Sequence, residues 1–455
     1  MHNKGRFPNA MFRGSLQPES AVLAITIMLL FLIFVFLFVF ITAQPAQGQT
    51  YRVIYSFSGG IDGAGPDAGL TIDNAGNLYG TTGGGGYTGG SCSPGGCGTV
   101  FKLSRHGSDW VFTSLYNFRG DDDGWCPEAP PTLGPDGGVY GTTTDGSPGG
   151  SPASKALQPA DNTCSGGYPC GTVYKLTPPA HPSPNAMSGW THTVLHHFQG
   201  YPTDGNQPYH STVTFDAHGA LYLTTYMGGE NGPGGGTVIQ MKPSNGGWSE
   251  TMMYSMGGDG SSPVSGVTLD ASGNIYGTAL YSGWGAGTVF ELTSSGGKWT
   301  EDVLHYFESQ GDGGFPMGGL ILDPAGNLFS TTSGGNYPYP SPTVFEMTNY
   351  GGNWQLNTLY SFAPLDNSPI AGVARDAAGN LYGTVYNIGG GCGLVFRLSP
   401  GQYGWAYTTL YDFSEPGMGC ESRGGVAVDA NGNIFGTTVW GGTYGPGVVF
   451  EISPE

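Results

Sequence analysis

Positive charge is scarce in this chain of 455 residues, which has 14 Lys and Arg against 33 Asp and Glu. A net charge of -19 at pH 7 cannot draw on the counterion release that drives binding to phosphate backbones, so nucleic acid is not an expected partner. The sequence also lacks Gly-x-x-x-x-Gly-Lys-Ser/Thr and Gly-x-Ser-x-Gly. The commonest nucleotide and serine-hydrolase sites are therefore not expected.

Long apolar runs are missing except for one, at residues 21–41, which follows a short basic segment. Its length exceeds a usual signal core and reaches the roughly 20 residues that span a bilayer. Residues 46–48 (Ala-Gln-Gly) form a small-x-small site that a signal peptidase accepts. We expect residues 1–48 to be either a cleaved signal peptide or a retained membrane anchor. Residues 49–455 then lie outside the cytoplasm, secreted or anchored.

Glycine and proline are abundant, with 84 and 33 residues, a level that usually indicates disorder or collagen. Neither fits this chain, because 9 Trp, 26 Tyr and 23 Phe supply core material and the glycines keep no three-residue period. No segment beyond the N-terminus has a helical hydrophobic period. The composition therefore predicts an all-β protein.

One phrase recurs along the chain, Asp-x-x-Gly-Asn-Leu-Tyr-Gly-Thr-Thr, with a period of about 53 residues in the C-terminal half. Its copies occupy 73–82, 216–225, 270–279, 323–332, 376–385 and 429–438, with a degenerate seventh at 134–143. Each unit has four strand-like runs, the third reading Gly-Thr-Val-Phe-x-Leu and the fourth running from Trp to an aromatic pair. Four strands per unit predict the blade of a β-propeller.

Closure of the ring is also predicted by the sequence. The seventh unit stops after its third strand, and residues 51–57 at the start of the mature chain match the missing fourth strand. We therefore expect a seven-bladed β-propeller of four-stranded blades over residues 49–455, with the N-terminal strand completing the last blade. A monomer is expected.

These phrases make the chain similar to the GloVer-type tandem-repeat family of secreted bacterial proteins, whose units read Asp-Gly-x-x-Pro, Ala-Gly-Leu, Asp-x-x-Gly-Asn-Leu-Tyr-Gly-Thr-Thr and Gly-Thr-Val-Phe-x-Leu. The resemblance covers residues 51–455 and implies export, without implying an activity. The second unit departs most, because it loses the Asp and Asn and gains an insertion near 144–170.

A residue present in every blade is expected to serve the blade rather than a single active site. We accordingly interpret Asp-x-x-Gly-Asn as a hairpin turn, and the Asp found four residues before the blade-entry proline in five units as a turn cap. In the sixth unit Asp366 is one residue out of register, and the last unit has no such Asp. A ring of such Asp residues lacks the dense oxygen set that Ca²⁺ prefers, so no cofactor or metal site is predicted, although one metal between neighbouring loops stays an alternative. The histidines are interpreted as polar residues of the outer strands.

Seven cysteines in an exported chain predict three disulfides and one remaining thiol. The spacing favours Cys97 with Cys126, Cys392 with Cys420, and Cys164 with Cys170, which would staple loops on one face. A competing scheme joins Cys92 with Cys97 and leaves Cys126 over.

Aromatic residues gather in the loops of that same face, where the units vary most. Such platforms suit sugar rings, but packing of these rings onto their own glycine-rich loops is the favoured interpretation. The candidate ligand-binding residues are Trp125, Tyr226, Tyr281, Trp284, Tyr337, Tyr339, Tyr386, Trp440 and Tyr444.

The function expected from these observations is non-catalytic recognition of an extracellular polymer, a glycan above all, or of a protein at the cell surface. No catalytic residue is predicted. The alternatives are a lactonase-like or lyase-like propeller enzyme with a divalent metal in its channel, and a purely structural surface protein. The first strands of the units, such as Gly-Leu-Thr-Ile, are apolar or hydroxyl-bearing and offer few metal ligands. Contact with a membrane is expected only through the N-terminal segment.

Overall fold

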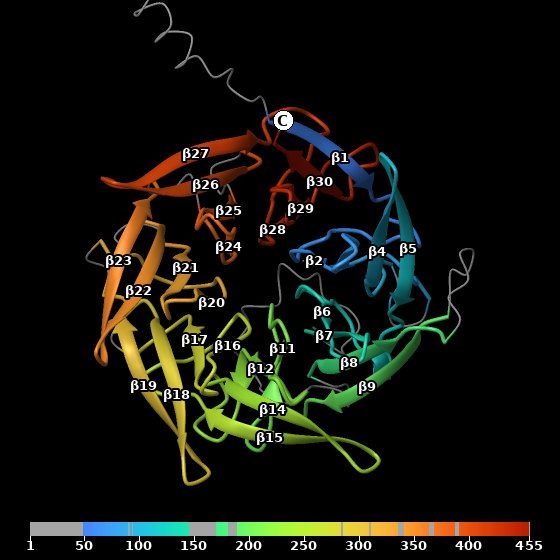
Figure 1. Cartoon of the computed structure of the whole chain (residues 1–455). Coiled ribbons are helices and arrows are strands. Elements are labelled where there is room, and N and C mark those ends of the chain that lie inside the picture. Colours follow the sequence, from blue (N-terminus) through green and yellow to red (C-terminus); the bar gives the residue numbers. More distant parts are fainter. Residues whose placement is uncertain are drawn as a thin grey trace, which may run out of the picture. The chain divides into compact units, whose positions relative to one another are not determined.

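Seven antiparallel sheets of four strands stand around a central axis (Figure 1). The computed structural model describes residues 49–89, 92, 94–144, 170–180, 189–283, 285–308, 311–334, 341–363, 368–386 and 391–454. Thr50–Ser453 form one unit. The predicted N-terminal targeting segment lies outside the described residues, and within those residues no helix has the length and apolar character needed to cross a membrane.

The first three blades follow the chain in order, and each runs from the axis outward. Blade 1 contains β2 (Thr71–Ile72), β3 (Leu78–Thr82), β4 (Thr99–His106) and β5 (Asp109–Asn117). A 3-10 turn, η2 (Asp121–Asp123), leads into blade 2, with β6 (Thr132–Leu133), β7 (Val139–Thr143), β8 (Thr172–Thr177) and β9 (Thr191–His197). Blade 3 contains β11 (Thr214–Phe215), β12 (Leu221–Thr225), β14 (Thr237–Ser244) and β15 (Gly247–Ser255), beside a ribbon of β10 (Gly205–Asn206) and β13 (Met227–Gly228).

The remaining blades repeat the pattern. Blade 4 contains β16 (Thr268–Leu269), β17 (Ile275–Ala279), β18 (Thr288–Ser295) and β19 (Lys298–Tyr306), and blade 5 contains β20 (Ile321–Leu322), β21 (Leu328–Thr332), β22 (Thr343–Tyr350) and β23 (Asn353–Ser361). Blade 6 contains β24 (Ala374–Arg375), β25 (Leu381–Val385), β26 (Leu394–Gly401) and β27 (Gly404–Asp412). Blade 7 contains β28 (Ala427–Val428), β29 (Ile434–Thr438), β30 (Val448–Ser453) and β1 (Thr50–Ser56).

The recurring Asp builds the tight turn between the first two strands of a blade. In blade 1 Asp73 Oδ1 accepts the backbone N–H groups of Ala75 and Asn77, at 2.9 and 2.8 Å. Gly76 takes φ +80° in this turn, a conformation that glycine adopts without strain. In the degenerate blade 2, Asp136 takes over by accepting the N–H of Gly138 at 3.0 Å. The hairpin interpretation is confirmed.

The glycine of the Tyr-Gly-Thr-Thr phrase is required by close packing inside the blade. A Cβ atom added at Gly80 would lie 2.4 Å from Cζ of Phe101, the aromatic residue of the third strand. Gly277 and Phe290 have the same relation in blade 4, again at 2.4 Å. Both rings are fully buried. The glycine of the phrase and the aromatic ring of the third strand thus pack directly against each other.

The first threonine of the phrase joins each blade to the next. Thr81 Oγ1 donates to the carbonyl of Ala129 at 3.2 Å, and Thr384 Oγ1 donates to that of Gly424 at 2.9 Å. The same bond recurs at Thr142, Thr224, Thr278, Thr331 and Thr437. Because Thr437 Oγ1 reaches the carbonyl of Ala68 in blade 1, at 2.7 Å, these bonds run around the whole ring.

The chain closes the ring as predicted. Strand β1 pairs antiparallel with β30, from Thr50 opposite Ser453 to Ser56 opposite Val448. Arg52 Nε donates to the buried carboxylate of Glu451 at 2.7 Å, which adds an ion pair to the backbone ladder. The last blade is therefore built from both ends of the propeller sequence.

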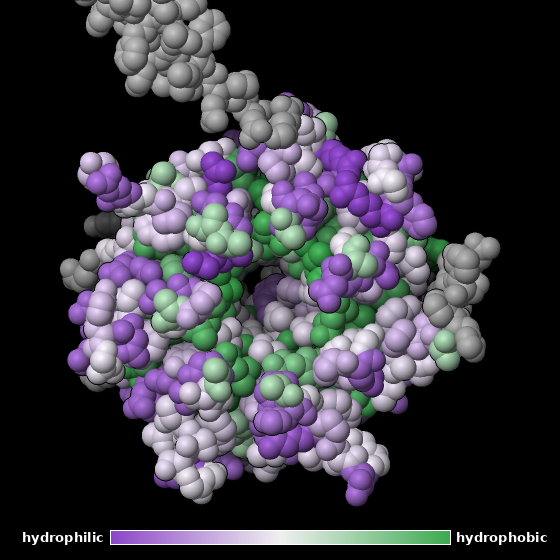
Figure 2. Space-filling view, in the orientation of Figure 1, coloured by the Kyte–Doolittle hydropathy of each residue, from purple (hydrophilic) through white to green (hydrophobic). Residues whose placement is uncertain are grey.

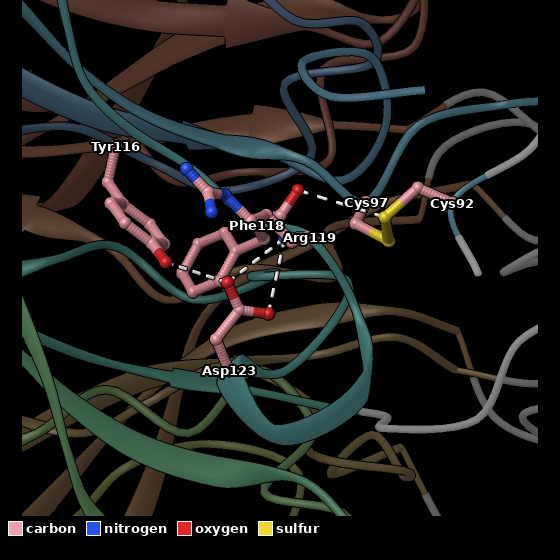
Figure 3. Close-up of a disulfide and its surroundings, with 6 residues drawn as sticks. All are labelled: Cys92, Cys97, Tyr116, Phe118, Arg119 and Asp123. Carbon is pink, nitrogen blue, oxygen red and sulfur yellow. Dashed lines mark hydrogen bonds between the residues drawn. A yellow bond between two sulfur atoms is a disulfide. The ribbon is translucent and has the colours of Figure 1, made fainter. Parts of the chain in front are cut away.

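Four of the blade-entry Asp residues cap their turns, as predicted, namely Asp62, Asp123, Asp204 and Asp312. Asp123 accepts the hydroxyl of Tyr116 at 2.7 Å and the backbone N–H of Arg119 (Figure 3). At the entries to blades 3 and 5, a histidine of the preceding blade's outer strand replaces the tyrosine. Asp204 pairs with His196 at 3.0 Å, and Asp312 pairs with His305 at 2.9 Å. These histidines thus belong to outer strands and loop turns.

Candidate functional site: the central cavity

A cavity of about 700 Å³ is lined by residues from all seven blades around the axis. Figure 2 shows a hollow at the centre of the ring, with hydrophobic residues prominent around it. The cavity is lined mainly by the segments that enter the first strand of each blade. From the sequence, only the apolar first strands of these segments were considered. The residues just before those strands were not predicted as site residues.

Local backbone geometry places one equivalent residue of six blades at this cavity. In blades 1 to 5 the residue before the blade-entry proline takes positive φ, as at Ser262 (+58°), whose N–H donates to the carbonyl of Gly235 at 2.8 Å. Two residues after that proline, the carbonyl accepts the inter-blade threonine bond, here from Thr224 to Ser265 at 2.6 Å. Blade 3 is the exception, because its acceptor is the carbonyl of Ser211, three residues after the proline. We call the residue directly after the proline, Val264 in blade 4, the cavity position.

The cavity position carries a different side chain in every blade. In chain order it is occupied by Asp67, Glu128, Tyr209, Val264, Met317, Ile370 and Arg423, the last following Ser422 instead of a proline. All except Val264 line the cavity. Val264 is 1% exposed and packs with Tyr226 and Leu280. Side chains of different chemistry therefore meet at one place, the central cavity, whereas a repeated motif places the same residue in every blade.

Arg423 is the centre of a charged network at the cavity. Its Nη1 lies 3.6 Å from Asp67 Oδ2, its Nη2 lies 3.1 Å from Glu421 Oε2, and its guanidinium lies 5.3 Å from the ring centroid of Tyr386. Burial by itself would lower the pKa of Arg423, but Asp67, Glu421 and Tyr386 raise it overall. The positive charge is therefore held in place by its neighbours.

Asp67 lines the cavity and has one carboxylate oxygen without a hydrogen-bond partner among the described residues. Its side chain is 12% exposed, and this oxygen, Oδ1, is buried. A buried carboxylate oxygen gains strongly from a hydrogen-bond donor, because leaving it unpaired costs about 1–3 kcal/mol or more. A ligand hydroxyl or amine is the kind of group that this atom would accept.

Glu128 and Tyr209 extend the polar wall into blades 2 and 3. Glu128 is 5% exposed, and its Oε2 accepts the hydroxyl of Thr144 at 2.7 Å. Its carbonyl accepts Nδ1–H of His210, also at 2.7 Å. Burial first, and then the charges of Glu128 and Asp67, raise the pKa of Tyr209 well above its usual range. Tyr209 therefore keeps its proton and can donate as well as accept.

The opposite side of the cavity is aliphatic. Met317 and Ile370 occupy the cavity position in blades 5 and 6, and first-strand residues such as Leu320 and Val373 continue the wall. The described residues contain no group of three or more His, Cys, Asp or Glu that could hold a metal ion. The arrangement is thus suited to holding a ligand that has donors on one side and apolar surface on the other.

The nine aromatic residues predicted from the sequence do not share one environment. Trp125 and Tyr226 are buried, at 8% and 7% exposure, so they pack within the fold and present no platform. Tyr386 lines the cavity beside Arg423. Exposed rings are found at Tyr281, Trp440 and Tyr444. Trp284, Tyr337 and Tyr339 lie outside the described residues. Ligand binding by the exposed aromatic residues stays a prediction.

The disulfides confirm one predicted pairing and correct another. Cys392 is bonded to Cys420, as expected. Cys97 is bonded to Cys92, the competing scheme, and not to Cys126 (Figure 3). Cys170 is disulfide-bonded too, and its expected partner Cys164 lies outside the described residues.

The Cys97–Cys126 prediction is wrong because the two units compared differ in register by one residue. The N–H of Cys126 donates to the carbonyl of Cys97, just as the N–H of Glu421 donates to that of Cys392. Cys126 and Glu421 also share a positive φ, +55° and +60°. Cys126 therefore corresponds to Glu421, and Trp125 stands where Cys420 forms its disulfide. The spacing looked similar in the two units but differs in register.

Comparison with known proteins agrees with this architecture. The fold and the site define a closed seven-bladed β-propeller with one asymmetric cavity on its axis. The chain belongs to the Gloeobacter/Verrucomicrobia repeat family, whose model matches residues 160–390 and 287–455. This confirms the resemblance drawn from the repeated phrases. No curated protein matches the chain.

Solved structures with a similar fold have varied functions. Hydrazine synthase of Kuenenia stuttgartiensis is 12% identical over 82% of this chain and 93% of its own, with a TM-score of 0.50. The polysaccharide lyase Uly1 is 13% identical, with 91% and 94% covered and a TM-score of 0.48. A protein from Lactobacillus plantarum is 14% identical, with 74% and 84% covered and a TM-score of 0.44. At such identities the likeness concerns the fold alone.

Proposed function

We propose that this protein is an extracytoplasmic recognition propeller that binds a segment of a glycan, or of a similarly hydroxyl-rich envelope polymer, in its central cavity without chemical turnover. The single observation that carries this proposal is the cavity position. Within repeats that otherwise share their turns and inter-blade bonds, this position differs in every blade, and six of its side chains line one cavity.

The size and lining of the cavity support a saccharide ligand. A volume of about 700 Å³ is within the range of small-molecule sites and accommodates a short segment of a sugar chain. The unpartnered Oδ1 of Asp67 supplies an acceptor for a sugar hydroxyl, and Tyr209 supplies a hydroxyl of its own. Aliphatic residues on the other side suit the apolar C–H surface of a sugar ring.

The charges in the wall support binding rather than catalysis. Arg423 lies beside two carboxylates, so its charge is balanced inside the protein and is not directed at a reacting group. Glu128 holds the hydroxyl of Thr144 and is thereby tied to its own blade. Groups committed to fixed internal contacts are suited to orienting a neutral ligand.

Export is the second part of the proposal. Disulfides persist in oxidising compartments, and the described residues contain the Cys92–Cys97 and Cys392–Cys420 bridges. The apolar run at residues 21–41 supplies the expected targeting element.

The test is a binding screen of the purified protein against a glycan array and a panel of envelope polymers, followed by calorimetry on the best ligand. We expect Asp67→Ala to weaken binding more than tenfold, because it removes the unpartnered acceptor. The matched control is Tyr403→Ala, which removes an aromatic ring that is 96% exposed and does not line the cavity. Absence of binding to any saccharide would overturn the glycan assignment, and release of shortened products would overturn the non-catalytic one.

A further inference from the structure

The wall of the cavity is divided between consecutive blades into two chemically different parts. Blades 7, 1, 2 and 3 contribute the polar arc, which consists of Arg423, Asp67, Glu128 and Tyr209. Blades 5 and 6 contribute the aliphatic arc, which consists of Met317 and Ile370. Blade 4 separates the two arcs, and its own cavity-position residue, Val264, is buried away from the cavity. A bound ring therefore meets donors and acceptors on one edge and hydrocarbon on the other.

Polar groups near the aliphatic arc are committed to the protein itself. Ser333 Oγ donates to the carbonyl of Phe315 at 2.9 Å, and Ser368 Oγ donates to that of Ser333 at 2.6 Å. The carbonyl of Ala371, next to Ile370, accepts the hydroxyl of Thr331 at 2.8 Å. A ligand hydroxyl placed against this arc would lose its hydration and find the local donors already engaged.

We propose that the cavity selects 6-deoxyhexoses, sugars that carry a methyl group where the parent hexose carries a hydroxymethyl group. The methyl group packs against Met317 and Ile370, while the ring hydroxyls face Asp67 and Tyr209. Burial of a methyl group is favourable, whereas burial of the extra hydroxyl at the same place leaves it without a partner. This inference rests on the proposed function, because it assumes that a saccharide occupies the cavity.

Matched sugar pairs isolate the methyl group. The intact protein is titrated calorimetrically with the methyl glycosides of L-fucose and L-galactose, and of L-rhamnose and L-mannose, because the two members of each pair differ by one hydroxyl. We expect the 6-deoxy sugar of at least one pair to bind about five- to tenfold more tightly, the size typical of one methyl-scale difference in an apolar pocket.

Variants of the two arcs locate the effect. Met317→Gln and Ile370→Thr make the aliphatic arc polar, and each is expected to bring the ratio within the pair close to one. Asp67→Asn is expected to weaken both members and to leave their ratio unchanged, because the polar arc contacts the hydroxyls that both share. Tyr403→Ala, outside the cavity, should change neither affinity nor ratio. Thermal melting of each variant checks that the ring remains folded.

The outcomes separate this inference from the function on which it rests. Equal affinity within both pairs overturns the selection of 6-deoxyhexoses and leaves saccharide binding intact. A preference that persists in Met317→Gln and Ile370→Thr also overturns it, because the methyl group would then lie elsewhere. Failure of every saccharide to bind, on the array as well as in calorimetry, overturns the proposed function itself.

Discussion

Two positions that are neighbours in space differ completely in how the repeats treat them. The first threonine of the repeated phrase is identical in all seven blades and bonds each blade to the next, as Thr384 does to the carbonyl of Gly424. The residue directly before that carbonyl, here Arg423, is the cavity position in every blade except blade 3, and the residue type at the cavity position differs in all seven blades. Because the threonine fixes the backbone on one side, the adjacent side chain is available for a unique role. In this repeat protein, the residues that recur in every blade build the fold, whereas the residues that differ between blades line the candidate site.

The comparison predicts that changes at repeated positions affect stability most. We expect Phe290→Ala to lower the free energy of unfolding by about 3–5 kcal/mol, because the buried ring fills the space over Gly277 and leaves a cavity when removed. Denaturant titration followed by tryptophan fluorescence measures the change. Tyr403→Ala, which truncates an exposed ring, should stay within about 0.5 kcal/mol. A similar loss in both variants would contradict the role of the repeated contact.

Arg423 is the cavity-position residue that we expect to matter for both stability and binding. It lies in blade 7, which strand β1 completes, and forms an ion pair with Asp67 in blade 1. We call this interface between blades 7 and 1 the joint. Arg423→Ala leaves Asp67 and Glu421 without their cation in a partly buried place, so the free energy of unfolding should fall by about 1–3 kcal/mol. Arg423→Lys should recover only part of this, because lysine lacks the planar group that lies over Tyr386.

Met317→Gln serves as the matched comparison at the cavity position, because Met317 takes part in none of the ion pairs of the described residues. We expect it to change stability by less than about 1 kcal/mol. If Met317→Gln destabilised the protein as much as Arg423→Ala, the polar network would not be what supports the joint.

The inter-blade threonine bond can be tested at the joint and away from it. Thr437→Val removes the hydroxyl that bonds Ala68 across the joint, and Thr384→Val removes the same bond between blades 6 and 7. Each should cost about 1–2 kcal/mol, because a buried carbonyl is left without its donor. Chemical denaturation of both variants should give losses that agree within about 0.5 kcal/mol. A much larger loss for Thr437→Val would show that the joint depends on this bond more than the other interfaces do.

The fold could be predicted because its determinants are repeated and local. Asp73, Gly76 and Gly80 each perform a task that the phrase itself reveals, namely the turn, the positive φ and the contact with the third strand. Ring closure could be predicted because the segment that forms β1 carries the aromatic pattern of a fourth strand, which the seventh repeat of the sequence lacks. Seven copies of the same evidence reinforce one another, so a degenerate copy in blade 2 did not obscure the architecture.

The site was harder to predict because its signal is a change of residue type. Asp67, Glu128 and Arg423 sit within short entry segments whose neighbours are nearly constant, and only aligning the copies shows that this one position varies in chemistry. Attention to aromatic loops led instead to Trp125 and Tyr226, whose side chains are buried. The disulfide of Cys97 depended on a one-residue register that spacing alone does not resolve.

The hairpin Asp residues give the smallest effect, which appears in the pH dependence of stability. Burial by itself would raise the pKa of Asp376, but hydrogen bonds from Asn380 and Tyr382 lower it overall. A carboxylate with a depressed pKa stabilises the folded state above its unfolded pKa of about 4, and this contribution is lost as the pH falls through the folded pKa. Asp376→Asn should therefore reduce stability by less than about 1 kcal/mol at pH 7 and by less still at pH 3. Thermal melting of both proteins between pH 3 and 7 measures the difference, and a gap that widened toward pH 3 would contradict the assignment.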